Sequence, residues 1–137
     1  MGTRRRAREL ALQLLYQYEL TGASPEVMQA AFEEWHSATD GVRAFADVLL
    51  RGSLEQLEEI DTELGLQTAH WRLERLAAVD RNILRLAMYE LLFETDTPHA
   101  VVINEAIEIA KRFGAKDSAR FVNGVLDGFV KRRAETG

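Results

Sequence analysis

Apolar residues recur at steps of three and four along most of the chain, the spacing that places side chains on one face of an α-helix. The first such stripe consists of Ala7, Leu10, Ala11, Leu14, Leu15 and Tyr18. Gly22 follows it, and glycine is the residue that most readily ends a helix. The pattern therefore predicts a first helix that carries this stripe and stops at Gly22.

Two further helices are predicted before residue 70. Ser24 followed by Pro25 is typical of a helix start, with the serine as N-cap and the proline in the first turn. The apolar face of this helix would comprise Met28, Ala31, Phe32 and Trp35. Asp40 can cap a longer helix that Gly52 permits to bend and that Gly65 would end. Its apolar positions are Val42, Phe45, Ala46, Leu49, Leu57 and Ile60.

The second half begins with the most apolar stretch of the chain. Residues 79–93 carry apolar side chains on nearly every side, which indicates a central helix surrounded by others. Thr97 and Pro98 repeat the pattern of a cap followed by proline, and Gly114 is placed to close the helix that they begin. The sequence therefore predicts a central helix followed by an amphipathic one.

The last predicted helix is capped by Asp117 and carries two glycines, Gly124 and Gly128, that would let a neighbouring helix approach closely. No sustained alternation of apolar and polar residues is visible, so strands are not expected. We therefore predict an all-α fold and a single compact domain over residues 1–137.

Composition agrees with one folded domain. The chain has 137 residues, of which 47% are hydrophobic and 28% charged, and it contains two prolines and no cysteine. The absence of cysteine excludes disulfide scaffolds and sulfur-ligated zinc sites. The basic N-terminus runs into a mixed sequence, not an apolar segment, so we expect a cytoplasmic protein with no membrane association.

Charge is distributed unevenly along the chain. The net charge is −5, but residues 1–8 and 111–137 together carry +8 whereas residues 9–110 carry −13. Basic ends on an acidic body indicate two kinds of surface, one of them suited to nucleic acid.

Catalytic motifs are not found. The sequence contains no phosphate-binding glycine-rich loop, no nucleophile elbow and no pair of histidines at metal-binding spacing. His36, His70 and His99 are far apart in sequence and are expected at helix ends. Asn104, Glu105 and Glu108 could form a polar site on one helix, but we expect them on a solvated face. An RNA-processing hydrolase would need a convergent acid or histidine cluster, so we expect neither an enzyme nor a metal or cofactor site.

Basic residues interleaved with aromatic ones favour binding of single-stranded RNA, because phosphates bind cations and splayed bases stack on rings. The cations at the N-terminus are Arg4, Arg5, Arg6 and Arg8. Tyr16 lies two turns beyond Arg8 on the same helix face, and Phe113 lies among Lys111, Arg112 and Lys116. Two alternatives remain open: the arginine run is a solubilising tail, and Phe113 is a core residue.

Three segments resemble the NusB family of antitermination factors. They are RRRARELALQLLYQYE at residues 4–19, DRNILRLAMYEL at residues 80–91 and INEAIEIAKRFGAKDSARFVNGVLDG at residues 103–128. The resemblance implies about six to seven helices in two packed subdomains and a function in binding, not catalysis. It also implies that the protein joins a small-subunit ribosomal protein, that the pair binds the single-stranded boxA element of nascent ribosomal RNA, and that the complex helps RNA polymerase resist termination.

Carried onto this chain, the resemblance implies a set of RNA-binding residues. They are Arg4, Arg5, Arg6, Arg8, Tyr16, Phe113, Lys116, Asp117 and Arg120. It places Asp80 against the ribosomal partner, whereas Gly128 departs from the bulkier polar residue expected there. The alternative is a structural homodimer whose basic ends only confer solubility. We further expect that deletion of residues 1–8 leaves the fold intact.

Overall fold

The computed structural model describes residues 2–68 and 72–136. Within these ranges the chain forms eight α-helices, one short 3-10 helix and no strand. The elements are α1 (Thr3–Thr21), α2 (Pro25–Ala31), α3 (Glu33–Ser37), α4 (Asp40–Glu55), α5 (Leu57–Gln67), η1 (Leu73–Arg75), α6 (Ala78–Phe93), α7 (His99–Phe113) and α8 (Ser118–Thr136). The all-α prediction is confirmed.

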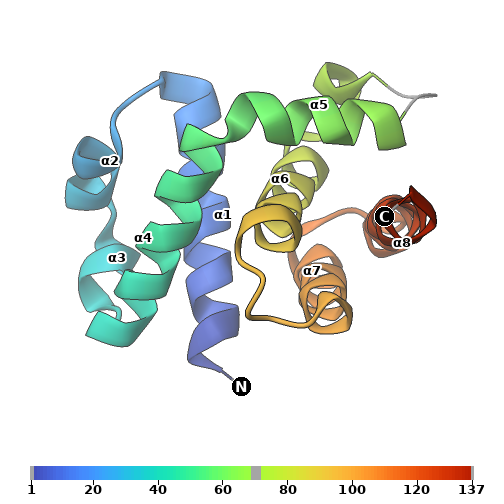
Figure 1. Ribbon diagram of the computed structural model, residues 1–137. Coiled ribbons are helices and arrows are strands. Elements are labelled where there is room, and N and C mark those ends of the chain that lie inside the picture. The colour runs from blue at the N-terminus through green and yellow to red at the C-terminus, as the bar shows by residue number, and fades with distance from the viewer. Residues whose placement is uncertain (1, 69–71, 137) are drawn as a thin grey trace.

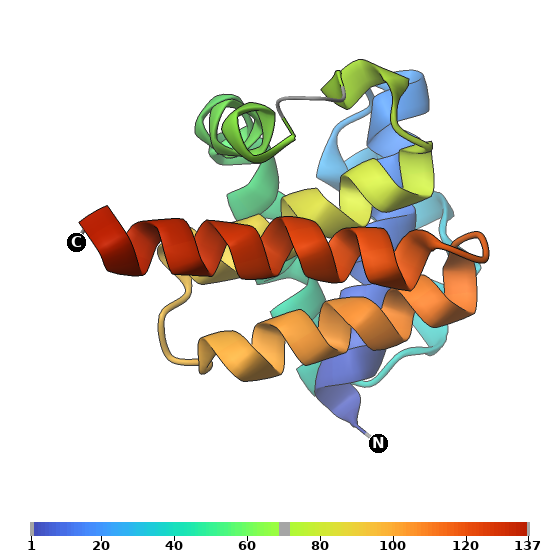
Figure 2. The same ribbon diagram turned by 90° about the vertical axis from the view of Figure 1, so that its right-hand side faces the viewer.

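The helices form two packed groups. Helices α1 to α4 gather on one side of the molecule and α5 to α8 on the other, as Figure 1 shows. The most extensive pairings lie inside the groups, between α1 and α4 and between α7 and α8, and the groups join where α6 packs against α1 and α4. Figure 2 shows α7 and α8 running side by side across the face of the second group. The two predicted subdomains are therefore present.

A single core lies around α1 and α6. Leu10 and Leu14 of α1 and Leu84 and Met88 of α6 are completely buried. Of the sixteen residues of α6, nine are buried, which confirms the prediction of a central helix covered on most sides. Because α6 packs against both α1 and α7, the position of α1 relative to α7 is fixed by packing.

Two breaks make the number of helices larger than predicted. The backbone is extended at Phe32, which separates α2 from α3 and buries the Phe32 ring. The predicted long helix divides at Gln56, not at Gly52, into α4 and α5. Apolar residues continue through both breaks, so their periodicity alone could not reveal them.

Several predicted helix ends were wrong by a few residues. Helix α5 continues through Gly65 and ends at Thr68, whose hydroxyl donates to the carbonyl of Leu64. Helix α7 starts one residue later than predicted, with Pro98 itself as the N-cap position. Gly22 does end α1, with a left-handed φ of 68°.

The glycines differ in how closely a neighbouring helix approaches them. A Cβ on Gly52 would lie 2.2 Å from the ring of Tyr89, so α4 and α6 meet closely there. A Cβ on Gly128 would lie close to the side chain of Gln67 on α5, which agrees with the close approach predicted there. A Cβ on Gly124 would have no neighbouring helix within 4 Å among the described residues. The close approach expected at Gly124 is therefore wrong. None of the described helices combines the length and apolar character needed to cross a bilayer.

Candidate nucleic-acid interface

The N-terminal turns of α1 lie beside the C-terminal half of α7, about a hundred residues away in sequence. Arg5 donates two hydrogen bonds of 2.8 Å to the carboxylate of Glu105. Arg112 donates to Glu9 from the opposite direction at 2.9 Å. These contacts, together with the core packing of both helices, place the N-terminal arginines next to the basic end of α7.

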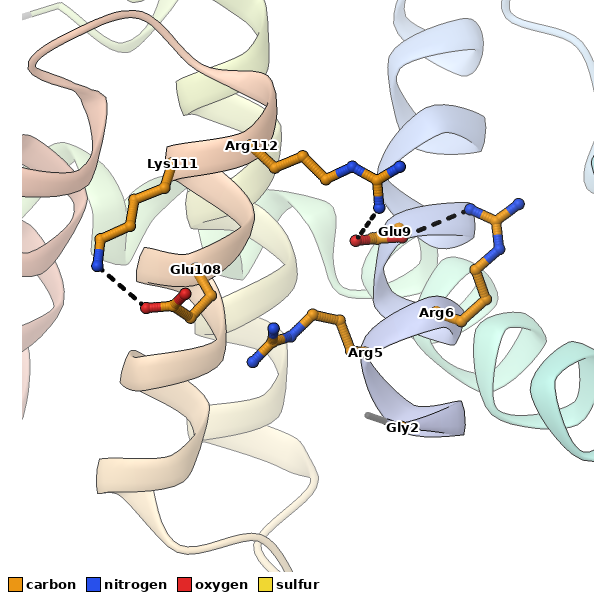
Figure 3. Close-up of a pocket in the computed structure, with 7 residues that line it drawn as sticks. All are labelled: Gly2, Arg5, Arg6, Glu9, Glu108, Lys111 and Arg112. Carbon is orange, nitrogen blue, oxygen red and sulfur yellow. Dashed lines mark hydrogen bonds and ion pairs between the residues drawn. The ribbon is translucent and has the colours of Figure 1, made fainter.

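A groove of about 450 Å³ runs between the two helices, as Figure 3 shows. It is lined by Gly2, Arg5, Arg6, Glu9, Glu108, Lys111 and Arg112. Four of these side chains are cationic and two are anionic. The groove therefore has a positive balance in a protein whose net charge is −5.

Glu9 organises the cations on both sides of this groove. Its side chain is only 4% exposed, and its two oxygens accept from Arg6 at 3.4 Å and from Arg112 at 2.9 Å. Arg112 is 63% exposed and Arg6 39%, so their remaining N–H groups face solvent. Glu108 binds Lys111 at 3.1 Å in a similarly exposed pair. The groove can therefore present several N–H donors to an anion.

Arg5 is held more tightly than the other groove cations. Its hydrogen bonds to Glu105 lower the pKa of that carboxyl group below its ordinary value, and the charge of Arg8 acts in the same direction. The same hydrogen bonds raise the pKa of Arg5. This pair fastens α1 to α7 across the edge of the groove.

Arg8 lies in a different environment from the other arginines. It donates to both oxygens of Glu90 on α6, at 2.7 and 2.8 Å, and its side chain is 6% exposed. Its guanidinium is also 3.7 Å from Glu105. Because its donors face the buried carboxylate of Glu90 and the partly buried one of Glu105, Arg8 contributes to the packing of α1, α6 and α7. Deletion of residues 1–8 would leave Glu90 buried without its partner, so we now expect this deletion to lower the stability of the fold strongly.

The two candidate aromatic residues lie together. Tyr16 and Phe113 line one apolar groove of about 350 Å³, with Leu12, Gln13, Gln17, Phe32 and Val79. Tyr16 is 39% exposed, and Phe113 is half-buried and packs against the core. The Arg112 guanidinium lies 5.0 Å from the Phe113 ring centroid and so links this apolar groove to the cationic one. Phe113 therefore packs against the core with one part of its ring and lines a surface groove with another.

The remaining candidates occupy two positions. Lys116 and Asp117 are exposed in the turn between α7 and α8, and Arg120 is exposed in the first turn of α8. Helix α8 begins directly after Asp117, whose carbonyl accepts from the N–H of Phe121. Asp80 is in the first turn of α6, next to Val79 of the apolar groove, and one of its carboxylate oxygens is buried with no hydrogen-bond partner in the described part of the chain.

The two basic ends of the chain meet only in part, because Lys111 and Arg112 line the groove with the N-terminal arginines whereas the last cations lie elsewhere. The run from Lys131 to Arg133 lies in the last turns of α8, about 20 Å along the helix axis from Ser118. Arg132 binds Glu63 and Gln67 of α5, and Lys131 binds Asp127. Figure 2 shows the C-terminus at the far end of α8 from the turn that leads out of α7. No residue from Lys131 to Arg133 is among those that line the groove.

Sequence reasoning did not identify Glu9, because a glutamate beside an arginine run gives no signal of its own. Glu105 was expected on a solvated face, whereas it is partly buried and bound to Arg5. It also did not identify Phe45 of α4, on which Arg4 lies with its guanidinium carbon 3.9 Å from the ring centroid. Over residues 2–68 and 72–136 there is no group of three or more histidines or carboxylates placed to hold a metal ion. The Nε2 atom of His36 donates to the carbonyl oxygen of Ala30 at 2.8 Å, and His70 lies outside the described residues.

Comparison with known proteins gives consistent results. The model of the NusB family matches residues 5–131. The transcription antitermination protein NusB of Geobacter sulfurreducens is 46% identical over 138 residues, and the alignment covers all of both chains. The structure of NusB from T. maritima superposes with a TM-score of 0.84 at 40% identity, covering 96% of this chain and 92% of that one.

A structure that contains a nucleic acid is also similar. It is the crystal structure of the antitermination factors NusB and NusE in complex with dsRNA, with a TM-score of 0.84 and 30% identity. The superposition covers 96% of this chain and 98% of that one. The similarity therefore extends over nearly the whole fold, including the helices that line the cationic groove.

Proposed function

This chain belongs to the NusB family, and we propose that it is a transcription antitermination factor that binds single-stranded RNA of the boxA type in the groove between α1 and α7. The observation that carries the proposal is the groove itself, where Arg5, Arg6, Lys111 and Arg112 line a cavity of about 450 Å³. Such a concentration of cations is otherwise unexpected on a protein of net charge −5.

The adjacent apolar groove supplies the second chemistry that single-stranded RNA requires. Phosphates are held by cations, and unpaired bases gain free energy by stacking on exposed rings. Tyr16 and Phe113 share one groove, and Arg112 lies beside Phe113 while lining the cationic groove. An RNA strand that follows Arg112 can thus contact both surfaces.

The predicted RNA-binding residues outside the cationic groove have two different proposed roles. Lys116, Asp117 and Arg120 would extend the surface beyond α7, where the exposed Asp117 carboxylate can accept a hydrogen bond from a base. Arg8 is assigned an indirect role, because its guanidinium is already bound to Glu90. It would position the N-terminal turns of α1 and not contact RNA.

The ribosomal partner would bind near Asp80. NusE accompanies NusB in the similar complex, and on this chain a small-subunit ribosomal protein would contact the start of α6. The position of Asp80 supports this assignment, because it is a partly exposed residue in the first turn of α6, directly after Val79 of the apolar surface groove. The partner and the RNA would then meet near Val79 and Phe113, which line the same groove.

The assembled complex would act on RNA polymerase during transcription of ribosomal RNA in the cytoplasm. The experiment that tests the proposal is a titration of fluorescein-labelled boxA RNA with this protein, alone and with the ribosomal protein. We expect saturable binding that weakens with salt and is tighter with the partner. Binding that is absent under both conditions would leave the structural homodimer as the better account, and light scattering would then measure its mass.

A further inference from the structure

A second groove lies on the other side of the first turn of α1. It has a volume of about 380 Å³ and is lined by Gly2, Arg4, Arg5, Arg8, Asp96, Thr97, Pro98, Val101 and Glu105. Gly2 and Arg5 line both this groove and the cationic groove, so the two are continuous around the N-terminus of α1. A strand that fills the first groove can therefore extend into the second.

Arg4 is the exposed cation at this second groove, and its guanidinium packs on an aromatic ring. Its guanidinium carbon lies 3.9 Å from the centroid of the Phe45 ring, at which distance the cation is in close contact with the ring face. The guanidinium carbon of the buried Arg8 lies 5.4 Å from the same centroid. Phe45 itself is half-buried and packs against the core, which fixes the position of its ring.

The donors and one face of the Arg4 guanidinium remain available. Arg4 is exposed, and within the described residues it makes no hydrogen bond or ion pair, whereas Arg5, Arg6, Arg8 and Arg112 each bind a carboxylate. One face of a planar guanidinium rests on Phe45, so the opposite face is open to a second planar group. Guanidinium planes are established stacking platforms for the bases of single-stranded RNA.

We propose that the RNA path continues past the N-terminus of α1 and that one base stacks on the exposed face of Arg4, with Phe45 as the positioning ring beneath it. The inference rests on the proposed RNA-binding function and adds a base subsite that neither charge nor sequence pattern indicates. Phe45 acts only through Arg4 and does not touch the RNA.

The test separates the planar shape of Arg4 from its charge. Arg4→Lys keeps the charge but removes the planar stacking surface, so RNA affinity should fall about tenfold while its salt dependence stays unchanged. Phe45→Leu should produce the same loss, and Phe45→Tyr, which keeps the ring, should bind like the wild type. Because Arg4 and Phe45 act as one unit, Arg4→Lys combined with Phe45→Leu should lose no more affinity than either change alone.

The probe is single-stranded boxA-type RNA, extended at both ends, with the fluorescent base 2-aminopurine placed at one position at a time. In wild-type protein, binding should quench the fluorescence at one position outside the boxA core, and Arg4→Lys should abolish that quenching alone. Arg75→Lys, an exposed arginine on η1 at the other end of α1, is the matched control and should change nothing. Circular dichroism of each variant checks that it is folded.

The outcomes distinguish this inference from the proposed function. If wild-type protein binds the RNA but Arg4→Lys and Phe45→Leu bind equally well with unchanged quenching, the stacking subsite is wrong and the proposed function stands. If Arg4→Lys weakens only the ribosomal partner, the second groove binds protein and the inference is overturned. If the wild type binds no RNA with or without the partner, the proposed function fails and this inference fails with it.

Discussion

Arg8 and Glu90 form a buried two-point ion pair that joins α1 to α6, with N–O distances of 2.7 and 2.8 Å. The side chains are 6% and 2% exposed, and their neighbours in the structure include Leu12, Ile83 and Leu86. A residue that appears in sequence as one member of a basic run is therefore part of the core. The first prediction follows from the burial of Arg8.

Arg8→Ala should lower the free energy of unfolding by about 3–5 kcal/mol, because it leaves the Glu90 carboxylate buried without a partner. Chemical denaturation of both variants measures the effect, with Arg6→Ala as the control. Arg6 is 39% exposed, so its replacement should cost much less.

Replacing both members of the pair separates stability from RNA binding. Arg8→Met with Glu90→Leu should recover much of the stability lost in Arg8→Ala, since no charge remains buried. If Arg8 only positions α1, this double variant binds RNA almost as well as the wild type. A stable double variant with strongly reduced RNA affinity would show that Arg8 contacts RNA directly.

The second prediction concerns Glu9, which competes with RNA for the cations that it orders. Glu9→Gln keeps a hydrogen-bonding side chain of the same size but removes a negative charge from between Arg6 and Arg112. RNA affinity should rise at low salt, and each additional phosphate contact should steepen the salt dependence by roughly 0.7 log units per decade. Glu33→Gln on α3, which changes the net charge equally at an exposed position, should leave the salt dependence unaltered. Equal effects of the two substitutions would show that Glu9 has no particular role in the groove.

The third prediction links stability to pH. Hydrogen bonds from Arg5 lower the pKa of Glu105, and those from Arg81 lower the pKa of Glu19. A carboxylate whose folded-state pKa is depressed adds stability above its unfolded pKa near 4.5, and that stability is lost as the pH falls through the lower folded value. The gap in stability between wild type and Glu105→Gln should therefore be fully present at neutral pH and shrink below about pH 4.5. Urea denaturation across this range measures the difference in stability between the two proteins. A difference that does not change with pH would contradict the depressed pKa assigned to Glu105.

Most of the helical architecture was predictable because it depends on local periodicity. The apolar stretch forms the central helix α6, as predicted, and the predicted glycine ends α1. The breaks at Phe32 and Gln56 were not predictable, since they arise where helices must turn to pack on one another. Gly52 was interpreted as a bend, but its function is to make room for the ring of Tyr89.

The candidate site was only partly predictable for a related reason. The sequence predicted which residue types would bind RNA, and the structure brings Tyr16 and Phe113 into one groove. Which arginines remain accessible depends on the carboxylates that the fold places beside them, and Glu90 and Glu105 come from helices remote from α1 in sequence. Information about such partners is not present in a local pattern.

The fourth prediction tests the glycine assignments. Gly52→Ala should destabilise the protein by about 1–3 kcal/mol, because the new Cβ would lie 2.2 Å from the Tyr89 ring and the core must shift. Gly124→Ala lies in open space on α8 and should stabilise it by up to about 1 kcal/mol through helix propensity. Thermal denaturation of the pair compares the two effects in one fold. Similar changes of the same sign in both variants would be inconsistent with the close approach of α4 to α6.

The central claim is that RNA occupies the groove between α1 and α7, and the salt dependence of RNA affinity tests it most directly. Arg6→Gln with Lys111→Gln removes one cation from each side of the groove, and Arg72→Gln with Arg75→Gln removes two exposed cations near η1. Both double variants change the net charge by the same amount. If the groove holds the phosphates, the first double variant flattens the plot of log affinity against log salt by roughly 1.4, and the second leaves its slope at the wild-type value. Equal slopes for the two double variants would place the RNA elsewhere on the protein.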